Sequence, residues 1–210
     1  MSKKVIFAHA GWTFWDDAAI RLRDDYGWEI CYFIGGTHQE KTQKHFPEAI
    51  FHSHADAKRI RVPEGCEAVK PSPLDKNLIT ALSSYESIYV KMMDRFNYNR
   101  TLSYRERIAT YHKQLMYWKG VIEHFQPDLV VFRMAPHMCH DYVLYSLCRV
   151  KGIDTLMFER PSIPGLVFPV GSFEDQSPVI EKKYLECLAK TNGDPISVSP
   201  EVCAHLEKLA

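Results

Sequence analysis

The sequence predicts an α/β fold, a doubly wound parallel sheet of about five strands with helices on both faces and a helical C-terminal tail. Two observations predict it. Short apolar runs, typical of strands buried on both faces, are separated by longer helical segments. In the second half, the order helix, PDLVVF, helix, GIDTLMF is a β-α-β alternation, which implies parallel strands with right-handed crossovers.

The composition is that of an ordinary globular protein. The chain has 210 residues, 46% hydrophobic and 25% charged, which suits one domain with a small appendage. Lys and Arg number 26 and Asp and Glu also number 26, so there is no basic excess to favour nucleic acid. The 11 Phe, 11 Tyr and 4 Trp residues supply enough core material to exclude a disordered chain.

The lack of a recognisable signal peptide and the pattern of cysteines predict a cytoplasmic protein. The start, MSKKVIFAHAGW, lacks the apolar region and cleavage site of a signal peptide, and no apolar run approaches the roughly 18 residues that span a bilayer. The six cysteines contain no CxxC pair and no regular spacing. We therefore expect reduced thiols.

The first third of the chain predicts three strands. Lys4–Ala8 is a continuous apolar run, a helix follows over Trp12–Asp25, and Trp28–Ile34 is the second strand. Ala49–His52 is a weaker third strand. Three prolines and one glycine between residues 61 and 75 indicate an irregular connection.

Two long helices are expected next. The first covers Lys76–Arg95. The second begins at Ser103, which forms a capping box with Glu106, and it ends before Pro127. Spacings of three and four place its apolar residues on one face: Ile108, Tyr111, Leu115, Trp118, Ile122 and Phe125.

The last part of the sheet and the tail follow. Asp128–Arg133 and Asp154–Phe158 predict strands, separated by a helix over Met138–Lys151. Beyond a stretch rich in Pro, Gly and Ser, a helix is expected over Val179–Lys190. A final helix opens with Ser199–Pro200 and carries no stop signal before the last residue, so we expect these residues to be the front of a longer protein.

Ligands of such sheets bind beyond the carboxyl ends of the strands. Four loops are therefore candidates, at residues 9–12, 35–38, 133–141 and 159–165. The sequence has no GxGxxG, no P-loop and no GxSxG motif. The substrate-binding candidates are His9, Gly11, Trp12, Gly35, Gly36, Arg133, His140 and Arg160.

The loop of residues 133–141 is the strongest candidate. Arg133 suits a bidentate contact with phosphate or carboxylate, and His137 or His140 could move protons near neutral pH. The helix that follows favours an anion at its N-terminus. The alternative is that Asp141 only caps this helix and that the histidines are ordinary loop residues.

A second candidate is Glu159 with Arg160, which emerge together from a buried strand. If Glu159 lines a cleft, it is the obvious general acid or base. The equally weighted alternative is an ion pair between the two side chains that braces the loop.

A third candidate is His52-Ser-His54-Ala-Asp56. This HxHxD pattern is similar to metallo-hydrolases of the β-lactamase type, in which another His follows the Asp. Here Ala57 stands in that place, so we predict no metal site and expect a polar loop at the sheet edge.

The stretch Lys91–Val170 carries KMMDRFN, YWKGVIEHFQPDLVVF and DYVLYSLCRVKGIDTLMFERPSIPG. It resembles the N-terminal half of bacterial capsule and lipopolysaccharide biosynthesis proteins with a GT-B glycosyltransferase arrangement. It is also similar to the N-terminal domain of UDP-N-acetylglucosamine 2-epimerases. The resemblance is good over about residues 90–170 and extends to the first 60 only through strand order.

The resemblance implies a two-domain glycosyltransferase of surface polysaccharide biosynthesis. Residues 1–170 would be its Rossmann-like acceptor-side domain, and residues 171–210 a helical tail or linker. The acceptor would be a glycan or glycolipid. A C-terminal domain, absent here, would hold a sugar nucleotide as co-substrate, and this chain would hold no cofactor. Peripheral membrane association of the full-length protein is compatible with this assignment.

The resemblance also implies roles for individual residues. Glu159 matches a functional carboxylate of the epimerases, whereas their aspartate after PDLVVF falls at Met134, which favours glycosyl transfer over epimerisation. Glu159, Asp141 or a nearby histidine such as His137 would be the catalytic base, and Arg133 and Arg160 would steady an acidic acceptor or the leaving group. The alternatives are a non-catalytic sugar-binding or partner-docking module, and a metal-dependent hydrolase or an epimerase.

Overall fold

The structure is a computed structural model, and it describes residues 2–10, 13–36, 39–96, 102–161, 166–174, 178–191 and 197–208. Its strands are β1 (Lys4–Ala10), β2 (Glu29–Gly35), β3 (Ile50–Ser53), β4 (Leu129–Phe132), β5 (Asp154–Glu159) and β6 (Phe168–Val170). Its helices are α1 (Thr13–Tyr26), α2 (Gln39–His45), α3 (His54–Arg59), α4 (Lys76–Ala81), α5 (Ser83–Met92), η1 (Met93–Phe96), α6 (Tyr104–Phe125), α7 (His140–Lys151), α8 (Pro178–Thr191) and α9 (Pro200–Glu207).

The six described strands form one sheet in the order β3-β2-β1-β4-β5-β6. The first five are parallel, and β6 pairs antiparallel with β5. The predicted parallel sheet is confirmed, but within the described residues it has six strands and not about five. The additional strand lies in the Pro-rich stretch after residue 161, where Pro169 is tolerated because β6 is an edge strand and needs hydrogen bonds on one side only.

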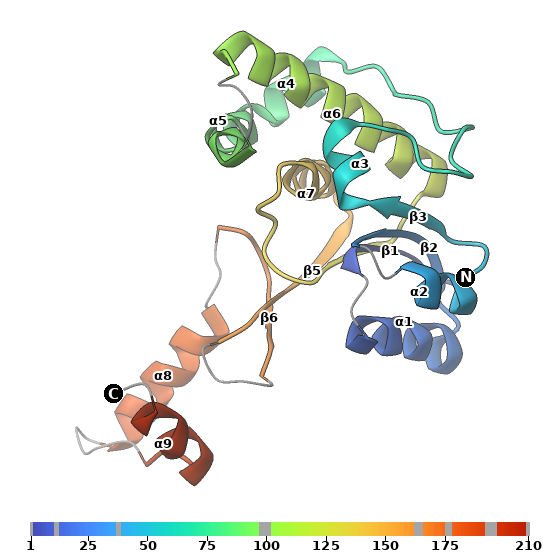
Figure 1. The fold of residues 1–210 in the computed structure, drawn as a ribbon. Coiled ribbons are helices and arrows are strands. Elements are labelled where there is room, and N and C mark those ends of the chain that lie inside the picture. The colour runs from blue at the N-terminus through green and yellow to red at the C-terminus, as the bar shows by residue number, and fades with distance from the viewer. Residues whose placement is uncertain are drawn as a thin grey trace.

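Helices cover both faces of the sheet, as a doubly wound fold requires (Figure 1). α1 and α2 lie on one face, and α3, α6 and α7 lie on the other, with α5 beside α6 and α7. Each face has its own apolar cluster. Trp15 and Phe46 pack under α1 and α2, whereas Trp118 and Tyr142 belong to the larger cluster under α6 and α7. α7 is enclosed on all sides, because every residue from His140 to Cys148 is buried.

The predicted helix start at Ser103 is confirmed. Ser103 and Glu106 form both hydrogen bonds of the capping box, and Gln126 ends α6 in the left-handed conformation. The expected apolar face is the one that packs, since Tyr111, Leu115 and Trp118 are buried. The sequence therefore determines this helix from its cap and its spacing alone.

The predicted single helix over Lys76–Arg95 is wrong in detail. The chain forms α4, α5 and the 3-10 turn η1, with a break at Leu82, whose φ and ψ are −90° and 0°. Leu82 is buried, and its carbonyl accepts a hydrogen bond from the hydroxyl of Tyr111. Packing against α6 therefore decides the break, which local propensity does not show.

The two predicted tail helices are present as α8 and α9, and neither buries a residue. They project away from the sheet and its covering helices (Figure 1). Within the part of the chain that the structure describes, no helix has both the length and the apolar character needed to cross a bilayer. All six cysteines are free thiols.

Gly120 of α6 provides a stability test of the packing on this face. A Cβ atom there would overlap the carbonyl oxygen of Lys70, in a segment held to α6 by the Ser72 N–H bond to the Met116 carbonyl. We expect Gly120→Ala to lower the free energy of unfolding by about 1–3 kcal/mol, although alanine favours a helix. Urea unfolding measures this. Gly171→Ala, which has open space around it, is the control, and equal stability of both variants would contradict the packing.

Candidate functional site

The carboxyl ends of the parallel strands meet at one edge of the sheet. From β1 the chain adds strands outward through β2 to β3, and it later returns to place β4 on the other side of β1. The helices that follow β1 and β4 therefore lie on opposite faces of the sheet, α1 on one and α7 on the other (Figure 1). This is the topological switch point, where doubly wound sheets form a ligand crevice.

A small pocket opens at this point. Its volume is about 70 Å³, and its lining comprises Phe14, Trp15, Arg133, Met134, Arg160 and Val167. Burial lowers the pKa of the Arg133 guanidinium, and the nearby positive charge of Arg160 lowers it further. An anion bound beside Arg133 and Arg160 would offset the unfavourable interaction between their two positive charges.

Aromatic side chains form the other wall of the pocket. The rings of Phe14 and Trp15 are 4.6 Å apart, and Trp15 packs edge-on against Phe158 at 5.0 Å. Trp15 is buried, whereas Phe14 is 49% exposed. An apolar ring beside two guanidinium groups suits a ligand with one apolar face and an acidic group.

Glu159 lies at the end of β5 and holds the loop after β4. Its Oε1 accepts a hydrogen bond of 3.1 Å from the N–H of Ala135. The alternative to catalysis was an ion pair with Arg160 that braces the loop, but this contact shows that the carboxylate braces the loop through the backbone N–H of Ala135. Glu159 is half-buried and next in sequence to Arg160 of the pocket, so its position also suits a role at the site.

Asp141 is fully buried at the start of α7. Its Oδ1 accepts hydrogen bonds of 2.7 Å from the N–H groups of Met138 and Tyr142, and its Oδ2 accepts one of 3.1 Å from the N–H of His137. Lys58 of α3 adds a favourable charge interaction. These contacts make Asp141 the residue that fixes the loop before α7, and they occupy the oxygens that a catalytic base would use.

His137 and His140 are held by backbone carbonyls of the same loop. Nδ1 of His137 lies 3.0 Å from the oxygen of Ala135, and Nδ1 of His140 lies 2.6 Å from the oxygen of Met138. His137 is half-buried and His140 is fully buried. Nε2 of His140 lies 3.3 Å from Nδ1 of His54, the first residue of α3.

The glycine candidates lie at the same edge. Gly35 ends β2 and pairs with Ala10 of β1 and Ser53 of β3, and Gly36 has open space around it. His9 belongs to β1. The side chain of His9, and all of Gly11 and Trp12, lie outside the described residues.

The HxHxD residues do not converge. His52 is buried with Nδ1 2.7 Å from the Tyr32 hydroxyl, and His54 turns to His140. Asp56 accepts a hydrogen bond from the hydroxyl of Ser53, the N-cap of α3, and pairs with Arg61. Among the described residues, no three His, Cys, Asp or Glu side chains form a group that could hold a metal ion. The expected polar loop is instead the helix α3, because Ser53 provides its cap.

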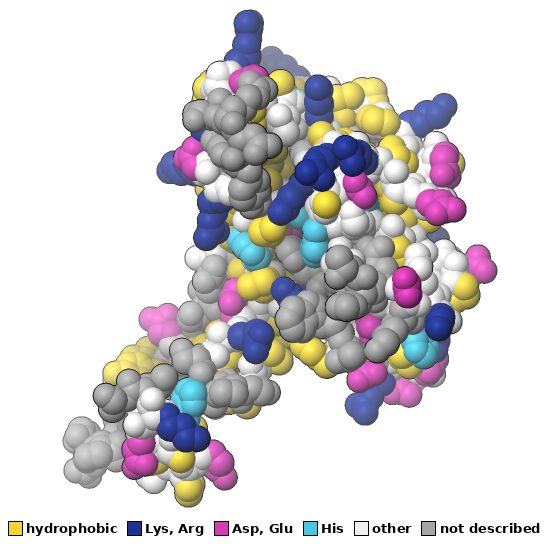
Figure 2. Space-filling view, in the orientation of Figure 1, with side chains coloured by type: hydrophobic (Ala, Val, Ile, Leu, Met, Phe, Trp, Pro, Cys, Tyr) yellow, Lys and Arg dark blue, Asp and Glu magenta, His cyan; other side chains and the backbone are white. Residues whose placement is uncertain are grey.

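Sequence reasoning missed two features of this edge. Phe14 belongs to the pocket, and an aromatic residue in the first turn of a predicted helix was the available signal. The contact between His54 and His140 had no signal, because 86 positions separate the two residues. Figure 2 shows histidine side chains near the centre of one face, with Lys and Arg side chains next to them.

Comparison of the sequence with protein-family models and with curated proteins found no match. The function must therefore be inferred from the site itself.

Proposed function

We propose that this chain is the acceptor-side domain of a glycosyltransferase of surface polysaccharide biosynthesis, and that it binds an acidic sugar or sugar phosphate at the switch point. The observation that carries the proposal is that one pocket is lined by two guanidinium groups, of Arg133 and Arg160, and by the rings of Phe14 and Trp15. The guanidinium groups would bind the acidic group, and the rings would cover the apolar face of the sugar.

The size of the pocket favours an acceptor over a nucleotide. A volume of about 70 Å³ suits a phosphate or carboxylate group, whereas small-molecule sites that enclose a whole ligand measure about 300 Å³ or more. The sugar nucleotide would then be the co-substrate held by another domain. In this arrangement Glu159 or His137 would stand beside the acceptor, and the arginines would hold it in place.

Binding of matched sugars tests the proposal. Glucose 6-phosphate and glucuronic acid should bind, and glucose should not. We expect Arg133→Gln and Arg160→Gln each to weaken binding of the acidic sugars about ten- to a hundredfold, because a charge-assisted hydrogen bond contributes about 1.5–3 kcal/mol. Calorimetric titration measures the affinities.

Arg149→Gln is the control, since Arg149 is exposed in the last turn of α7, at the end away from the loop of Arg133. It should leave affinity unchanged. Equal affinity for glucose and glucuronic acid, or full affinity in both pocket variants, would overturn the proposed site.

A second measurement tests the assignment to the acceptor side. A ligand that binds the native state raises the melting temperature. We expect no rise with UDP-, GDP-, dTDP- or CMP-sugars. A clear rise with one of them would place the donor site in this chain and contradict the assignment.

A further inference from the structure

We propose that the acidic ligand of the switch-point pocket is a phosphate joined to a hydrocarbon chain, so that the sugar acceptor is linked to a lipid. The phosphate lies beside Arg133 and Arg160, and the chain lies along Met134 and Val167, which line the same pocket. The inference rests on the function proposed above and makes it more specific, because the ring of Phe14 is left for the sugar.

The charged part of the pocket lies at the ends of two adjacent strands. Arg133 follows β4 and Arg160 follows β5, and these parallel strands pair as far as Phe132 and Met157. Both arginines therefore reach one pocket at this edge of the sheet. A monoalkyl phosphate carries a charge of about −1.5 to −2 at neutral pH and three acceptor oxygens, so it can bind two planar guanidinium groups at once.

The other described residues that line the pocket are all apolar. Trp15 is buried, but Val167 is 45% exposed and Met134 is half-buried, so these two side chains offer apolar surface to a ligand. A single exposed apolar side chain is common on protein surfaces and needs no explanation. Here two of them adjoin a pair of cations, and a hydrocarbon chain attached to the bound anion would remove their apolar surface from water.

The pairing of β5 with β6 brings Val167 to this place. Glu159 pairs with Phe168 in an antiparallel ladder, so Arg160 and Val167 are the next residues of the two segments. Phe168 packs into the apolar cluster under α7. Because successive side chains of an extended chain point to opposite faces, Val167 turns toward the face of α1, where it lines the pocket.

Size and chemistry both favour a chain beside the phosphate. A volume of about 70 Å³ has room for a phosphate group, so the rest of the ligand lies outside, over the exposed surface of the lining residues. Val167 has no hydrogen-bonding group for a sugar hydroxyl, and Met134 has only a weak acceptor. Neither side chain has a flat face on which a sugar ring could stack, whereas flexible Met adapts to an irregular aliphatic chain.

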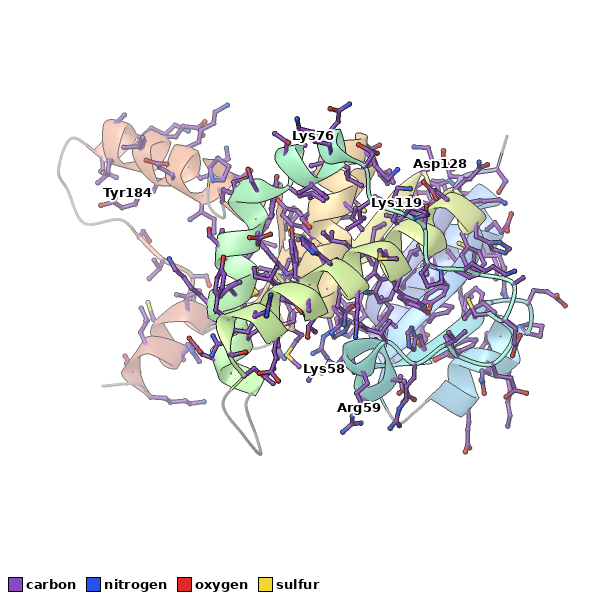
Figure 3. All side chains as sticks on the ribbon, turned by 90° about the horizontal axis from the view of Figure 1, so that it is seen from above. Lys58, Arg59, Lys76, Lys119, Asp128 and Tyr184 are labelled. Atoms are coloured by element: carbon purple, nitrogen blue, oxygen red, sulfur yellow. The ribbon has the colours of Figure 1, made fainter. Side chains whose placement is uncertain are left out.

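The tail of the protein carries a second exposed apolar surface that could bind an alkyl chain. Helix α8 exposes Ile180, Tyr184 and Leu185, and it extends away from the sheet and from the helices that cover the sheet (Figure 3). A chain bound there would have no need of the two arginines. Substitution of Tyr184 therefore separates binding at the tail from binding at the pocket.

Calorimetric titration with monoalkyl phosphates, below their micelle concentrations, tests the inference. We expect octyl phosphate to bind about tenfold more tightly than ethyl phosphate, because each buried CH₂ group strengthens binding up to about fourfold and this chain is covered on one side only. Neutral octyl glucoside should bind about tenfold more weakly than octyl phosphate, since it cannot form charge-assisted hydrogen bonds. Arg160→Gln should weaken the binding of ethyl and octyl phosphate alike.

Variants of the apolar wall locate the chain. Val167→Ser combined with Met134→Ser should remove most of the gain from ethyl to octyl phosphate and leave affinity for ethyl phosphate within about twofold of wild type. Val62→Ser is the matched control, because Val62 is 49% exposed in the segment between α3 and α4. Val62→Ser and Tyr184→Ser should both keep the full gain. Circular dichroism confirms that each variant is folded.

Equal affinity for ethyl and octyl phosphate would overturn the inference, and so would a gain that survives in the double variant or disappears in Tyr184→Ser. In each of these cases binding of glucose 6-phosphate would still support the proposed function. If the gain depends on Val167 and Met134 while neither glucose 6-phosphate nor glucuronic acid binds, the pocket holds an amphiphilic phosphate but the assignment to a sugar acceptor is wrong.

Discussion

Replacement of Asp141 by alanine should lower the free energy of unfolding by about 3–5 kcal/mol, the largest loss expected for a single side chain of the site. The carboxylate is fully buried and accepts hydrogen bonds from the N–H groups of His137, Met138 and Tyr142. Alanine would leave these donors without their acceptor at the start of α7. Urea unfolding followed by circular dichroism measures the change.

Two further variants make the test of Asp141 specific. Asp141→Asn keeps one acceptor oxygen but turns an amide toward an N–H donor, so it should cost about 1–3 kcal/mol. Asp128→Ala removes an exposed carboxylate that accepts one bond of 2.8 Å, from the N–H of Lys4, and should cost about 1 kcal/mol or less. If Asp141→Ala keeps the stability of the wild type but no longer binds acidic sugars, Asp141 contacts the ligand instead of holding the loop.

His52 should make the protein less stable in mild acid. Its side chain is fully buried, and burial lowers its pKa from 6.5 to about 4. Above pH 6.5 the ring is neutral in both states and contributes no pH dependence. As the pH falls from 6.5 toward 4, the unfolded chain binds a proton that the folded chain does not, so stability is lost in this window.

The size of the acid effect follows from these two pKa values. Between pH 7.5 and pH 5 the loss due to His52 is about 2 kcal/mol. His52→Asn should remove it, because the amide can replace Nδ1 in the contact with the Tyr32 hydroxyl and does not titrate. The difference in unfolding free energy between the two pH values is the readout. An unchanged difference in the variant, or an equal effect of His124→Asn at an exposed position, would contradict the assignment.

Local signals predicted most elements because those elements depend on neighbouring residues. The capping box at Ser103, the stop before Pro127 and the C-terminal glycine of α7, Gly152, act within one turn of a helix. The break at Leu82 was not predictable, because it depends on packing against α6. The helices α2 and α3 and the strand β6 are short, and short elements carry too few residues for a periodic signal.

For the candidate residues, the sequence predicted which of them lie near one another better than it predicted their contacts. Parallel strands put their carboxyl ends at one edge, so Arg133, Glu159 and Arg160 were expected near one another. Arg133 and Arg160 do line one pocket, and Glu159 reaches the loop between Arg133 and His137. The roles of individual side chains were not fixed by the pattern, since a carboxylate before a helix can face solvent, a substrate or the backbone.

The sequence by itself determined the fold class, the alternation of strands and helices, and the edge of the sheet at which the candidate residues lie, because apolar periodicity, helix caps and crossover connections depend on residues that are close in the chain. Only the tertiary structure decided that Asp141 is enclosed by backbone donors, that His52 is buried away from His54, and that His54 meets His140. These outcomes depend on contacts between segments distant in the chain, and burial and hydrogen bonding across such contacts set the chemistry of each side chain.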